Sequence, residues 1–584
     1  MSEHDLVIRG GLVVDGTGTP GSVADVAVRD GVVVAVAPRI DGRGHREIDA
    51  DGLLVTPGFV DIHTHFDGQA AWDSLLAPSS VNGVTSVVLG NCGVGFAPAH
   101  RSDDEHEWLI RMMEGVEDIP GTALSEGLTW EWETFGEYLD TLAARRFSVD
   151  VGTQMPHAPL RAYVMGERGA DPAEEPTDAE LASMAEHVRA AVEAGALGFS
   201  TSRTVNHRTR DGDALGTRHS SGRELQALAG AMSAGGHGVV QLVSDAYLST
   251  DGDHVASELA MLTELATSTG RPLSLSLQQP DAAPDRWREI LAWIDACTAD
   301  GLAIKAQVAP RPIGVLMGLT ASLHPLMICP SFAALAGRPL TEIVGALARP
   351  EVRATLVAEH AEALRTDTAP LTTLMGTFGR LFPLGDPVDY EPSPSTSVAA
   401  LARSQGRAPI EVVIDVLLGN GGTDLLYSPL FNYAHGNLDD VREMLLSPHT
   451  IIGLSDAGAH CGAVCDASFP TTALSLWSRD RATGQLPLEL MVHHLTQRTA
   501  RHVGWHDRGV LAPGLRADIN VIDMATLGAR PPRIAHDLPA GGRRLVQTAH
   551  GYRHTFTGGA ETFTDGEHTG ALPGRLVRGP QAAR

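Results

Sequence analysis

The sequence predicts an α/β protein with three parts: a (β/α)8 TIM-like barrel, a small β-sandwich domain formed from both chain ends, and an inserted subdomain. Two observations support this fold class. Apolar strand-like runs alternate with helical stretches through the middle of the chain, and short β-branched runs occur near both ends. We expect residues 1–56 and 500–584 to form the sandwich, residues 57–499 the barrel, and residues 311–448 the insertion.

The two chain ends carry similar β-strand signals. Residues 6–14 and 23–37 are rich in valine and are broken by Gly and Asp, a pattern typical of antiparallel strands joined by turns. A comparable pattern returns in residues 509–524. Because neither end is long enough to form a hydrophobic core alone, we expect a single β-domain assembled from both.

The middle of the chain has the pattern of a parallel sheet. Its apolar runs are separated by helical segments, as in repeated βα units, and eight such units are what a closed barrel requires. The candidate strands are residues 58–65, 85–92, 149–154, 196–202, 238–244, 272–278, 302–308 and 450–456.

The last two candidate strands are separated by an unusually long segment. About 140 residues lie between Ala309 and His449, and they include both helix-like and Pro/Gly-rich stretches. A compact domain does not hold a structureless loop of that length. We therefore expect an inserted subdomain on the catalytic face, acting as a lid.

Composition excludes several classes of function. The formal net charge of −27 argues against nucleic acid as a partner, because phosphate binding needs a clustered basic face. No apolar run reaches the length of a membrane span, and the first residues lack the features of a signal peptide. We expect a cytoplasmic protein that acts on a small molecule. The sequence leaves its oligomeric state open, with a homo-oligomer as one possibility.

The cysteines fit a reducing compartment. There are five, an odd number in a long chain, which does not suggest a disulfide framework. Cys461 and Cys465 form the sequence CGAVC, which lacks the second pair that a structural zinc site needs. We expect these two to be small buried residues.

The strongest motif for chemistry is PGFVDIHTH, which ends in His63 and His65. Residues two apart in a strand point to the same side, so both imidazoles face the same space. At the carboxyl end of a barrel strand, that space is the active-site mouth. Two neutral imidazoles there suit zinc or a similar metal, so we interpret both residues as metal ligands.

Asp456 ends the eighth candidate strand, in TIIGLSDAGAH. It too is expected to point into the mouth. There its carboxylate can bind the metal and take a proton from the attacking water. The alternative is an ordinary helix N-cap. We interpret Asp456 as both metal ligand and catalytic base.

Three further residues follow the second and third strands. Cys92, in VLGNCGVG, is equally consistent with a thiolate ligand and with a buried thiol. His157 is a candidate for contacting the substrate or polarising its carbonyl group, and a loop cap is the alternative. Arg161 is equally a candidate for pairing with a substrate carboxylate and for a surface salt bridge.

Other histidines are weaker candidates. Of these, His460 is closest to the predicted site, and we assign it to substrate binding. His493 and His494 lie in a helical pattern and are expected to be packing or surface residues. The remaining candidates are His219 and His435.

With these residues in view, the chain resembles the amidohydrolase superfamily and, within it, the D-aminoacylase (N-acyl-D-amino-acid deacylase) family. The resemblance runs through VTPGFVDIHTHFD, GVTSVVLGNCGVG, HAPLRAYVMG, GALGFSTS, IIGLSDAGAH and LAPGLRADINVID. It implies that Cys92 is a metal ligand and that Asp456 is the catalytic base. It also implies hydrolysis of an amide C–N bond, with an N-acyl amino acid, specifically an N-acyl-D-amino acid, as substrate.

The chain departs from the family at strands five and six, where the family supplies two more histidine ligands. Here these strands carry glutamine and serine, which are poor zinc ligands. We therefore expect one firmly bound divalent ion, most consistent with Zn²⁺. Two alternatives stay open: hydrolysis or C–C cleavage of another small carbonyl compound, and a degenerate member that binds without catalysis. The polar residues in question are Gln241, Ser244, Gln278 and Gln279.

Overall fold

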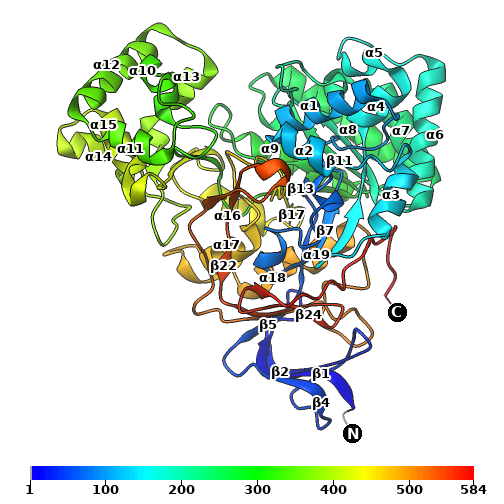
Figure 1. The fold of residues 1–584 in the computed structure, drawn as a ribbon. Coiled ribbons are helices and arrows are strands. Elements are labelled where there is room, and N and C mark those ends of the chain that lie inside the picture. The colour runs from blue at the N-terminus through cyan, green and yellow to red at the C-terminus, as the bar shows by residue number, and fades with distance from the viewer. Residues whose placement is uncertain (1–2, 584) are drawn as a thin grey trace.

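The computed structural model describes residues 3–583 and has three visibly distinct regions (Figure 1). A β-sheet region containing the N-terminus lies at the bottom of the view. A body of parallel strands with surrounding helices lies above it, and a separate group of helices, α10 to α15, stands at the upper left. No helix in the described part of the chain is long and apolar enough to cross a membrane.

The body is α/β, as the sequence predicts, and each of the eight predicted strands overlaps an observed one. Its parallel strands form two hydrogen-bonded sheets, β6-β7-β8 and β17-β13-β12-β11-β10-β9. Only Gln154 separates β8 from β9, and a parallel bridge from Thr64 to Ala457 connects the segments that follow β6 and β17. The strands are β6 (Phe59–Asp61), β7 (Val84–Leu89), β8 (Asp150–Thr153), β9 (Met155–Pro156), β10 (Gly198–Arg203), β11 (Val239–Ser244), β12 (Leu273–Ser276), β13 (Ile304–Val308) and β17 (Thr450–Ile452).

Helices between these strands begin and end where the sequence provides caps. The side chain of Thr177 accepts a hydrogen bond from Glu180 N–H at the start of α6, and Gly195 ends that helix in the left-handed region. The helices of the body are α1 (Asp103–Glu117), α2 (Gly121–Gly127), α3 (Phe135–Ala143), α4 (His157–Met165), α5 (Glu167–Ala170), α6 (Asp178–Ala194), α7 (Gly222–Ala234), α8 (Gly252–Thr269), α9 (Arg286–Ala299), α16 (Asp439–Leu446), α17 (Phe469–Ser475), α18 (Leu488–Leu495) and α19 (Gln497–His502).

Both chain ends contribute to one mixed sheet of nine strands, in the order β25-β24-β23-β18-β5-β1-β2-β3 with β4 on β1. All nine strands are connected by hydrogen bonds, and whether they pack as the two layers of the predicted sandwich stays a prediction. Strand β1 connects the parts of this sheet, because its first half pairs with β4 and its second half pairs with β5, on either side of a bulge. The strands are β1 (His4–Val13), β2 (Ser22–Arg29), β3 (Val32–Ala37), β4 (Gly44–Asp49), β5 (Leu54–Pro57), β18 (Ile519–Ile522), β23 (Tyr552–Thr557), β24 (Ala560–Thr564) and β25 (Glu567–His568).

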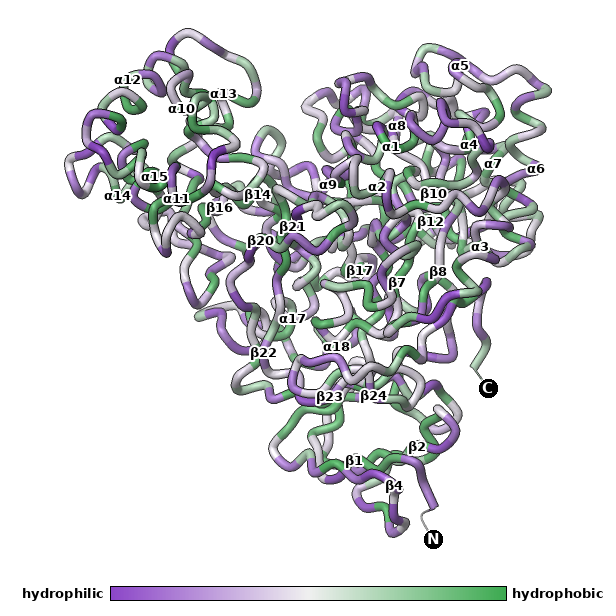
Figure 2. The backbone as a smooth tube through the Cα atoms, viewed as in Figure 1, coloured by the Kyte–Doolittle hydropathy of each residue, from purple (hydrophilic) through white to green (hydrophobic). Residues whose placement is uncertain are grey.

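This sheet encloses its own apolar cluster. Strands β1 and β2 are largely hydrophobic in Figure 2, and their inward side chains pack against those of β18. Two short antiparallel strand pairs follow β18 in the chain, one enclosed by the other. They are formed by β19 (Gly528–Ala529) with β22 (Ala549–His550) and by β20 (Arg533–Ala535) with β21 (Arg544–Val546).

The segment between β13 and β17 has a hydrophobic core of its own, which includes Met317, Leu347, Leu356, Val413 and Leu426. From β14 to β16 it contains a three-stranded sheet and six α-helices, and α16 follows them before β17. These strands and six helices are β14 (Ile313–Met317), β15 (Phe382–Pro383), β16 (Leu426–Phe431), α10 (Pro330–Ala333), α11 (Leu340–Leu347), α12 (Pro350–Thr366), α13 (Pro370–Met375), α14 (Val398–Gln405) and α15 (Pro409–Leu417).

The base of this segment is attached to the loop that follows β12. Asn432 and Gln279 exchange two hydrogen bonds, from Asn432 N–H to Gln279 C=O and from Gln279 N–H to Asn432 Oδ1. Arg380 forms an ion pair with Asp281 nearby. These contacts lie at the carboxyl ends of the parallel strands, where barrel enzymes place their active sites. The lid function of the segment stays a prediction.

Two histidines inside this segment predict acid sensitivity. His324 and His360 pack beside the rings of Phe332 and Phe378 and are only 8% and 2% exposed, and burial lowers the pKa of each to about 4. Below the usual pKa of about 6.5 the unfolded chain takes up protons that the folded chain does not. Stability should therefore fall as pH drops from about 6.5 to about 4, by up to roughly 3 kcal/mol per histidine.

Urea unfolding at pH 7 and at pH 5, followed by limited proteolysis of this segment, measures the effect. The non-titrating double variant His324→Asn/His360→Gln is the comparison, and its segment should lose less stability between the two pH values than wild type. Equal losses in the two proteins would contradict the assignment of acid sensitivity to these side chains.

Candidate metal centre and active site

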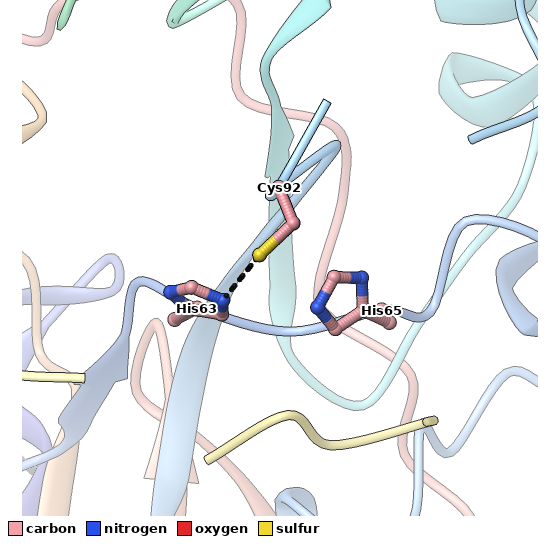
Figure 3. A group of neighbouring side chains, drawn as sticks. All are labelled: His63, His65 and Cys92. Atoms are coloured by element: carbon pink, nitrogen blue, oxygen red, sulfur yellow. Dashed lines mark hydrogen bonds between the residues drawn. The ribbon is translucent and has the colours of Figure 1, made fainter. Parts of the chain in front are cut away.

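Two imidazoles and a thiol converge at the carboxyl ends of β6 and β7. Nitrogen atoms of His63 and His65 and the Sγ of Cys92 all lie within 4.8 Å of one another, and all three residues are buried (Figure 3). The closest approach is 3.1 Å, between His63 Nε2 and Cys92 Sγ. Such a set of nitrogen and sulfur donors has the composition of a zinc site.

Local pairing explains why both histidines reach the same space. The chain stays extended beyond β6, because Thr64 N–H donates to Val88 C=O and His65 N–H donates to Ala457 C=O. Because Thr64 points to the opposite side, His63 and His65 point to the same side of the chain, and their ring centroids lie 5.5 Å apart.

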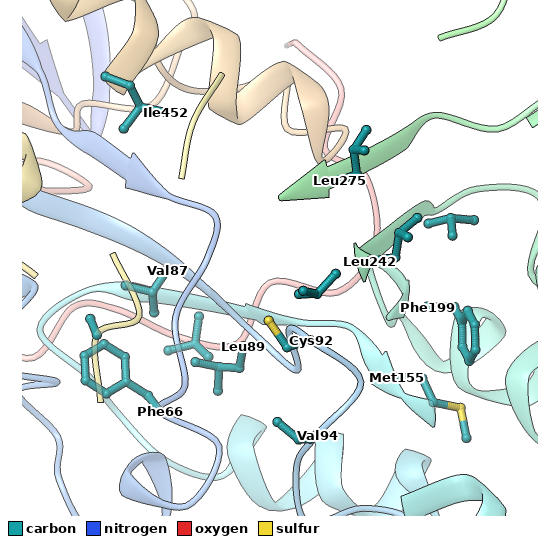
Figure 4. Packing of buried hydrophobic residues seen from close by; sticks show 14 of the residues in the cluster. Phe66, Val87, Leu89, Cys92, Val94, Met155, Phe199, Leu242, Leu275 and Ile452 are labelled. Atoms are coloured by element: carbon teal, nitrogen blue, oxygen red, sulfur yellow. The ribbon is translucent and has the colours of Figure 1, made fainter. Parts of the chain in front are cut away.

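Cys92 is held in an uncommon backbone conformation. Its φ of 56° lies in the left-handed region, and its N–H donates to Gln241 Oε1 at 2.8 Å. Around it lie apolar side chains that include Leu89, Val94 and Leu242 (Figure 4). Strained backbone of this kind costs on the order of 1–3 kcal/mol and is concentrated at functional sites.

Asp456 lies against the two histidines. Its Oδ1 is 3.2 Å from His63 Nε2 and 3.9 Å from His65 Nε2. This oxygen is buried and makes no hydrogen bond within residues 3–583. The loop that carries it contains three non-glycine residues in the left-handed region: Leu454, Asp456 and His460. The carboxylate thus faces the same small space as the imidazoles and the thiol.

Behind each imidazole lies an oxygen atom. Gln307 Oε1 is 2.6 Å from His63 Nδ1, so the His63 ring donates from Nδ1 and leaves Nε2 free to act as a ligand. Glu117 Oε1 is 3.3 Å from His65 Nδ1. Sequence reasoning missed both residues. Gln307 could have been found, since it occupies an inward position of a predicted strand, but Glu117 lies at the end of a helix and gives no such signal.

The electrostatics of this space favour a bound cation. Burial, followed by the nearby carboxylates of Asp456 and Glu117, raises the pKa of the Cys92 thiol well above its usual value of about 9. Burial, followed by His63, lowers the pKa of His65 well below its usual range. A thiolate at this position therefore needs a positive charge close by. The donor types and the unpartnered Asp456 Oδ1 fit a divalent metal.

The structure corrects the interpretation of Arg161. Its guanidinium is 1% exposed, and Nη1 donates to both carboxylate oxygens of Glu224, at 2.6 and 2.7 Å. Its other nitrogens donate to the carbonyl oxygens of Gly169 and Glu174. These protein acceptors occupy the guanidinium, so Arg161 is a buried structural residue and neither a substrate ligand nor part of a surface salt bridge.

His157 belongs to the same network. It is fully buried, its Nδ1 lies 2.9 Å from Thr201 Oγ1, and its Nε2 lies 3.0 Å from Glu224 Oε1. Burial lowers its pKa, although the hydrogen bond to Glu224 acts in the opposite direction. With both ring nitrogens engaged, His157 supports the loops around the site. This geometry corrects its assignment as a catalytic residue that contacts substrate.

His460 reaches the edge of the metal-binding group. Its Nε2 is 3.8 Å from Glu117 Oε2 and 4.0 Å from Asp456 Oδ2, and a third of its side chain is exposed. One histidine that the sequence did not single out, His207, follows β10. Its Nδ1 lies 2.7 Å from Ser202 Oγ. Burial, followed by the nearby His460 and His63, lowers the pKa of His207 to about 3.

The remaining candidate histidines contact residues outside the metal-binding group. His494 is buried against Leu445 C=O, and His493 contacts Gly16 C=O, which agrees with their expected packing and surface roles. His435 is exposed and pairs with Asp440, and His219 is exposed after β10. Cys461 and Cys465 are buried and unpaired, as expected.

Three of the four polar residues on and beyond strands five and six have structural partners. Gln241 supports Cys92 as described, and Ser244 donates to Glu258 Oε2. Gln279 donates to Asp440 and is hydrogen-bonded to Asn432. Gln278 Oε1, by contrast, is buried without a hydrogen-bond partner in the described part of the chain.

Comparison with known proteins shows the family to which this chain belongs. A family model described as "Amidohydrolase family" matches residues 46–563, so the chain belongs to the amidohydrolase family. It is 26% identical over 582 residues to a D-aminoacylase of Alcaligenes xylosoxydans xylosoxydans, covering 98% of this chain and 97% of that protein. An N-acyl-D-glutamate deacylase of the same organism is 30% identical over 320 residues, covering 53% of this chain and 57% of that protein.

A solved structure gives the same result. The crystal structure of a D-aminoacylase, described as defining a novel subset of amidohydrolases, superimposes with a TM-score of 0.65 at 25% identity. The superposition covers 98% of this chain and all of that one. These matches confirm the resemblance seen in the sequence motifs.

Proposed function

We propose that this protein is a metal-dependent hydrolase that cleaves the amide C–N bond of an N-acyl amino acid, with N-acyl-D-amino acids as the first substrates to test. The convergence of His63, His65, Cys92 and Asp456 at the ends of three parallel strands carries this proposal. Membership of the amidohydrolase family and similarity to D-aminoacylase support it.

Each residue in this group has a role in the proposed reaction. A divalent ion held by His63, His65, Cys92 and Asp456 would supply Lewis acidity to the substrate carbonyl and to the attacking water. Asp456 accepts a proton from the water as its oxygen forms a bond to the carbonyl carbon. The C–N bond then breaks, and Asp456 returns the proton to the leaving nitrogen, giving a carboxylic acid and a free amine.

The donor set favours one firmly bound ion, and zinc in particular. Thiolate and imidazole together suit zinc better than calcium or magnesium, which prefer oxygen ligands. The glutamines and serine on β11 and beyond β12 provide no further nitrogen or sulfur ligand. His460, half-buried beside Asp456, is proposed to contact the substrate at the edge of this centre.

We further propose that the two parallel sheets form one closed (β/α)8 barrel, spanning residues 57–499. The bridge between Thr64 and Ala457 supports closure. Residues 1–56 and 500–584 would then form the β-domain, and residues 311–448 a lid over the mouth. A cytoplasmic location and small-molecule substrates are part of this proposal.

Metal removal provides the first test. Purified protein should contain about one equivalent of zinc per chain and deacylate members of a panel of N-acyl-D- and N-acyl-L-amino acids. Treatment with a chelator should abolish this activity, because the ion supplies the Lewis acidity of the reaction, and added zinc should restore it. Metal analysis and amine release are the two measurements.

Each outcome separates the alternatives. Two equivalents of metal would mean that further ligands exist, and His460 and His207 are then the first to check. If the protein binds metal and does not deacylate the panel, but converts another small carbonyl compound, the result would favour the alternative of hydrolysis or C–C cleavage of such a compound. Metal without any turnover would favour a binding protein, and activity without metal would contradict the proposal.

A further inference from the structure

Glu117 is a buried carboxylate in an unfavourable position. It is 2% exposed and ends α1, where the helix dipole disfavours negative charge. Within residues 3–583 no donor makes a hydrogen bond to its side chain, and no lysine or arginine pairs with it. A buried charge without a partner is costly, so its retention calls for a compensating positive charge.

The carboxylate lies on the far side of His65 from Asp456. Glu117 Oε1 is 3.3 Å from His65 Nδ1, whereas His65 Nε2 faces Asp456 Oδ1 at 3.9 Å. The imidazole is therefore placed between Glu117 and the proposed metal position. Its Nδ1 is buried and makes no hydrogen bond in the described chain, although an acceptor lies almost within reach.

The backbone fixes this carboxylate against the loop after β17. His460 N–H donates to the backbone carbonyl of Glu117, and Gly462 N–H donates to Asp118 Oδ2 at 3.0 Å. His460 Nε2 lies 3.8 Å from Glu117 Oε2. The end of α1 and the loop that carries Asp456 are thus connected to each other.

The second imidazole has an analogous partner without charge. Gln307 Oε1 is 2.6 Å from His63 Nδ1, and Gln307 Nε2 donates in turn to Ser274 Oγ. Histidine ligands commonly donate their second ring N–H to such acceptors, which fixes the tautomer and orients the ring. The acceptor behind His65 differs in bringing a negative charge next to the site.

We propose that Glu117 is a positioning residue of the metal centre. It accepts a hydrogen bond from His65 Nδ1–H, which directs Nε2 toward the ion, and its charge compensates the bound cation. This inference rests on the proposed metal-dependent function. Bound metal polarises the imidazole N–H and stabilises the carboxylate, so Glu117 and the ion favour each other's presence.

The test compares metal affinity with the stability of the metal-free protein. In chelator competition with zinc, Glu117→Gln should bind about 10-fold more weakly than wild type and Glu117→Ala up to about 100-fold. Glutamine keeps an acceptor and loses only the charge. Without metal, Glu117→Gln should melt at the same temperature as wild type or higher, because a buried unpaired carboxylate has been removed. Zinc should therefore raise the Tm of this variant less than that of wild type.

A matched control lies one turn earlier on the same helix. Glu114 is 26% exposed and pairs with Arg210, so Glu114→Gln should leave zinc affinity unchanged. Equal zinc affinity in wild type and Glu117→Gln would overturn the inference. A lower Tm of metal-free Glu117→Gln, together with unchanged zinc affinity, would also overturn the inference, because it indicates a purely structural role. If wild type binds no metal, the proposed function itself fails, and this result is distinct from the other two.

Discussion

Replacing Asp456 with asparagine is expected to leave the protein folded and to lower kcat by about 10²- to 10⁴-fold. Asparagine matches the size of aspartate, but its amide cannot accept a proton from water. The Asp456 carboxylate lies 3.2 Å from His63 Nε2 and 3.9 Å from His65 Nε2. Among residues 3–583 it is the only acidic side chain that lies against both imidazoles, since Glu117 contacts only His65. Steady-state kinetics with metal analysis of the same sample measures the change.

The control is Asp480→Asn, at a half-exposed residue that pairs with Arg479 outside the site. Its kcat should equal that of wild type. A near-normal kcat for metal-loaded Asp456→Asn on the true substrate would exclude Asp456 as the base. A loss of both metal and activity would instead assign it chiefly to metal binding.

The largest expected loss of stability follows from Asp150→Asn. Asp150 is fully buried in β8, where Arg508 donates to it at 2.8 Å and Arg516 lies 3.1 Å away. Arg575 N–H donates to its other oxygen. In Asp150→Asn, Arg508 keeps Asp507 and Arg516 keeps Asp518 as partners, but both arginines lose their most deeply buried carboxylate, at a cost of about 3 kcal/mol. Urea unfolding at neutral pH measures this loss.

An exposed ion pair provides the comparison. Asp565, 63% exposed, pairs with Arg553, and Asp565→Asn should change the free energy of unfolding by less than about 1 kcal/mol. Similar losses in the two variants would show that the buried network between the β-sheet region and the body contributes no more than a surface contact.

The residues predicted best are those whose position depends on strand periodicity alone. His63 and His65 alternate beyond one strand, and Asp456 follows another, so their convergence requires only that parallel strands end at the same edge. The joining of both chain ends in one sheet was also predictable from local strand patterns. Both ends carry strand patterns without enough apolar residues for separate cores.

The residues predicted worst depend on which helix packs where. Arg161 was interpreted as a candidate substrate ligand because the sequence does not reveal that Glu224, on another helix, lies against it. Glu117 escaped notice because its neighbour His65 is distant in the chain. The pairing of β1 with both β4 and β5, on either side of a bulge, was also not predicted. Such contacts follow from tertiary packing, which no local pattern reports.

The sheet shared by the two chain ends also sets an order of assembly during synthesis. Strand β5 pairs with β1 on one side and with β18 on the other. When the first 57 residues leave the ribosome, the edge of β5 has no partner, and it stays open until almost the whole chain has been made. An open strand edge is a template for pairing with other chains. The nascent protein is therefore most exposed to aggregation before Ile519–Ile522 emerges, and completion of the sheet is a late event in its folding.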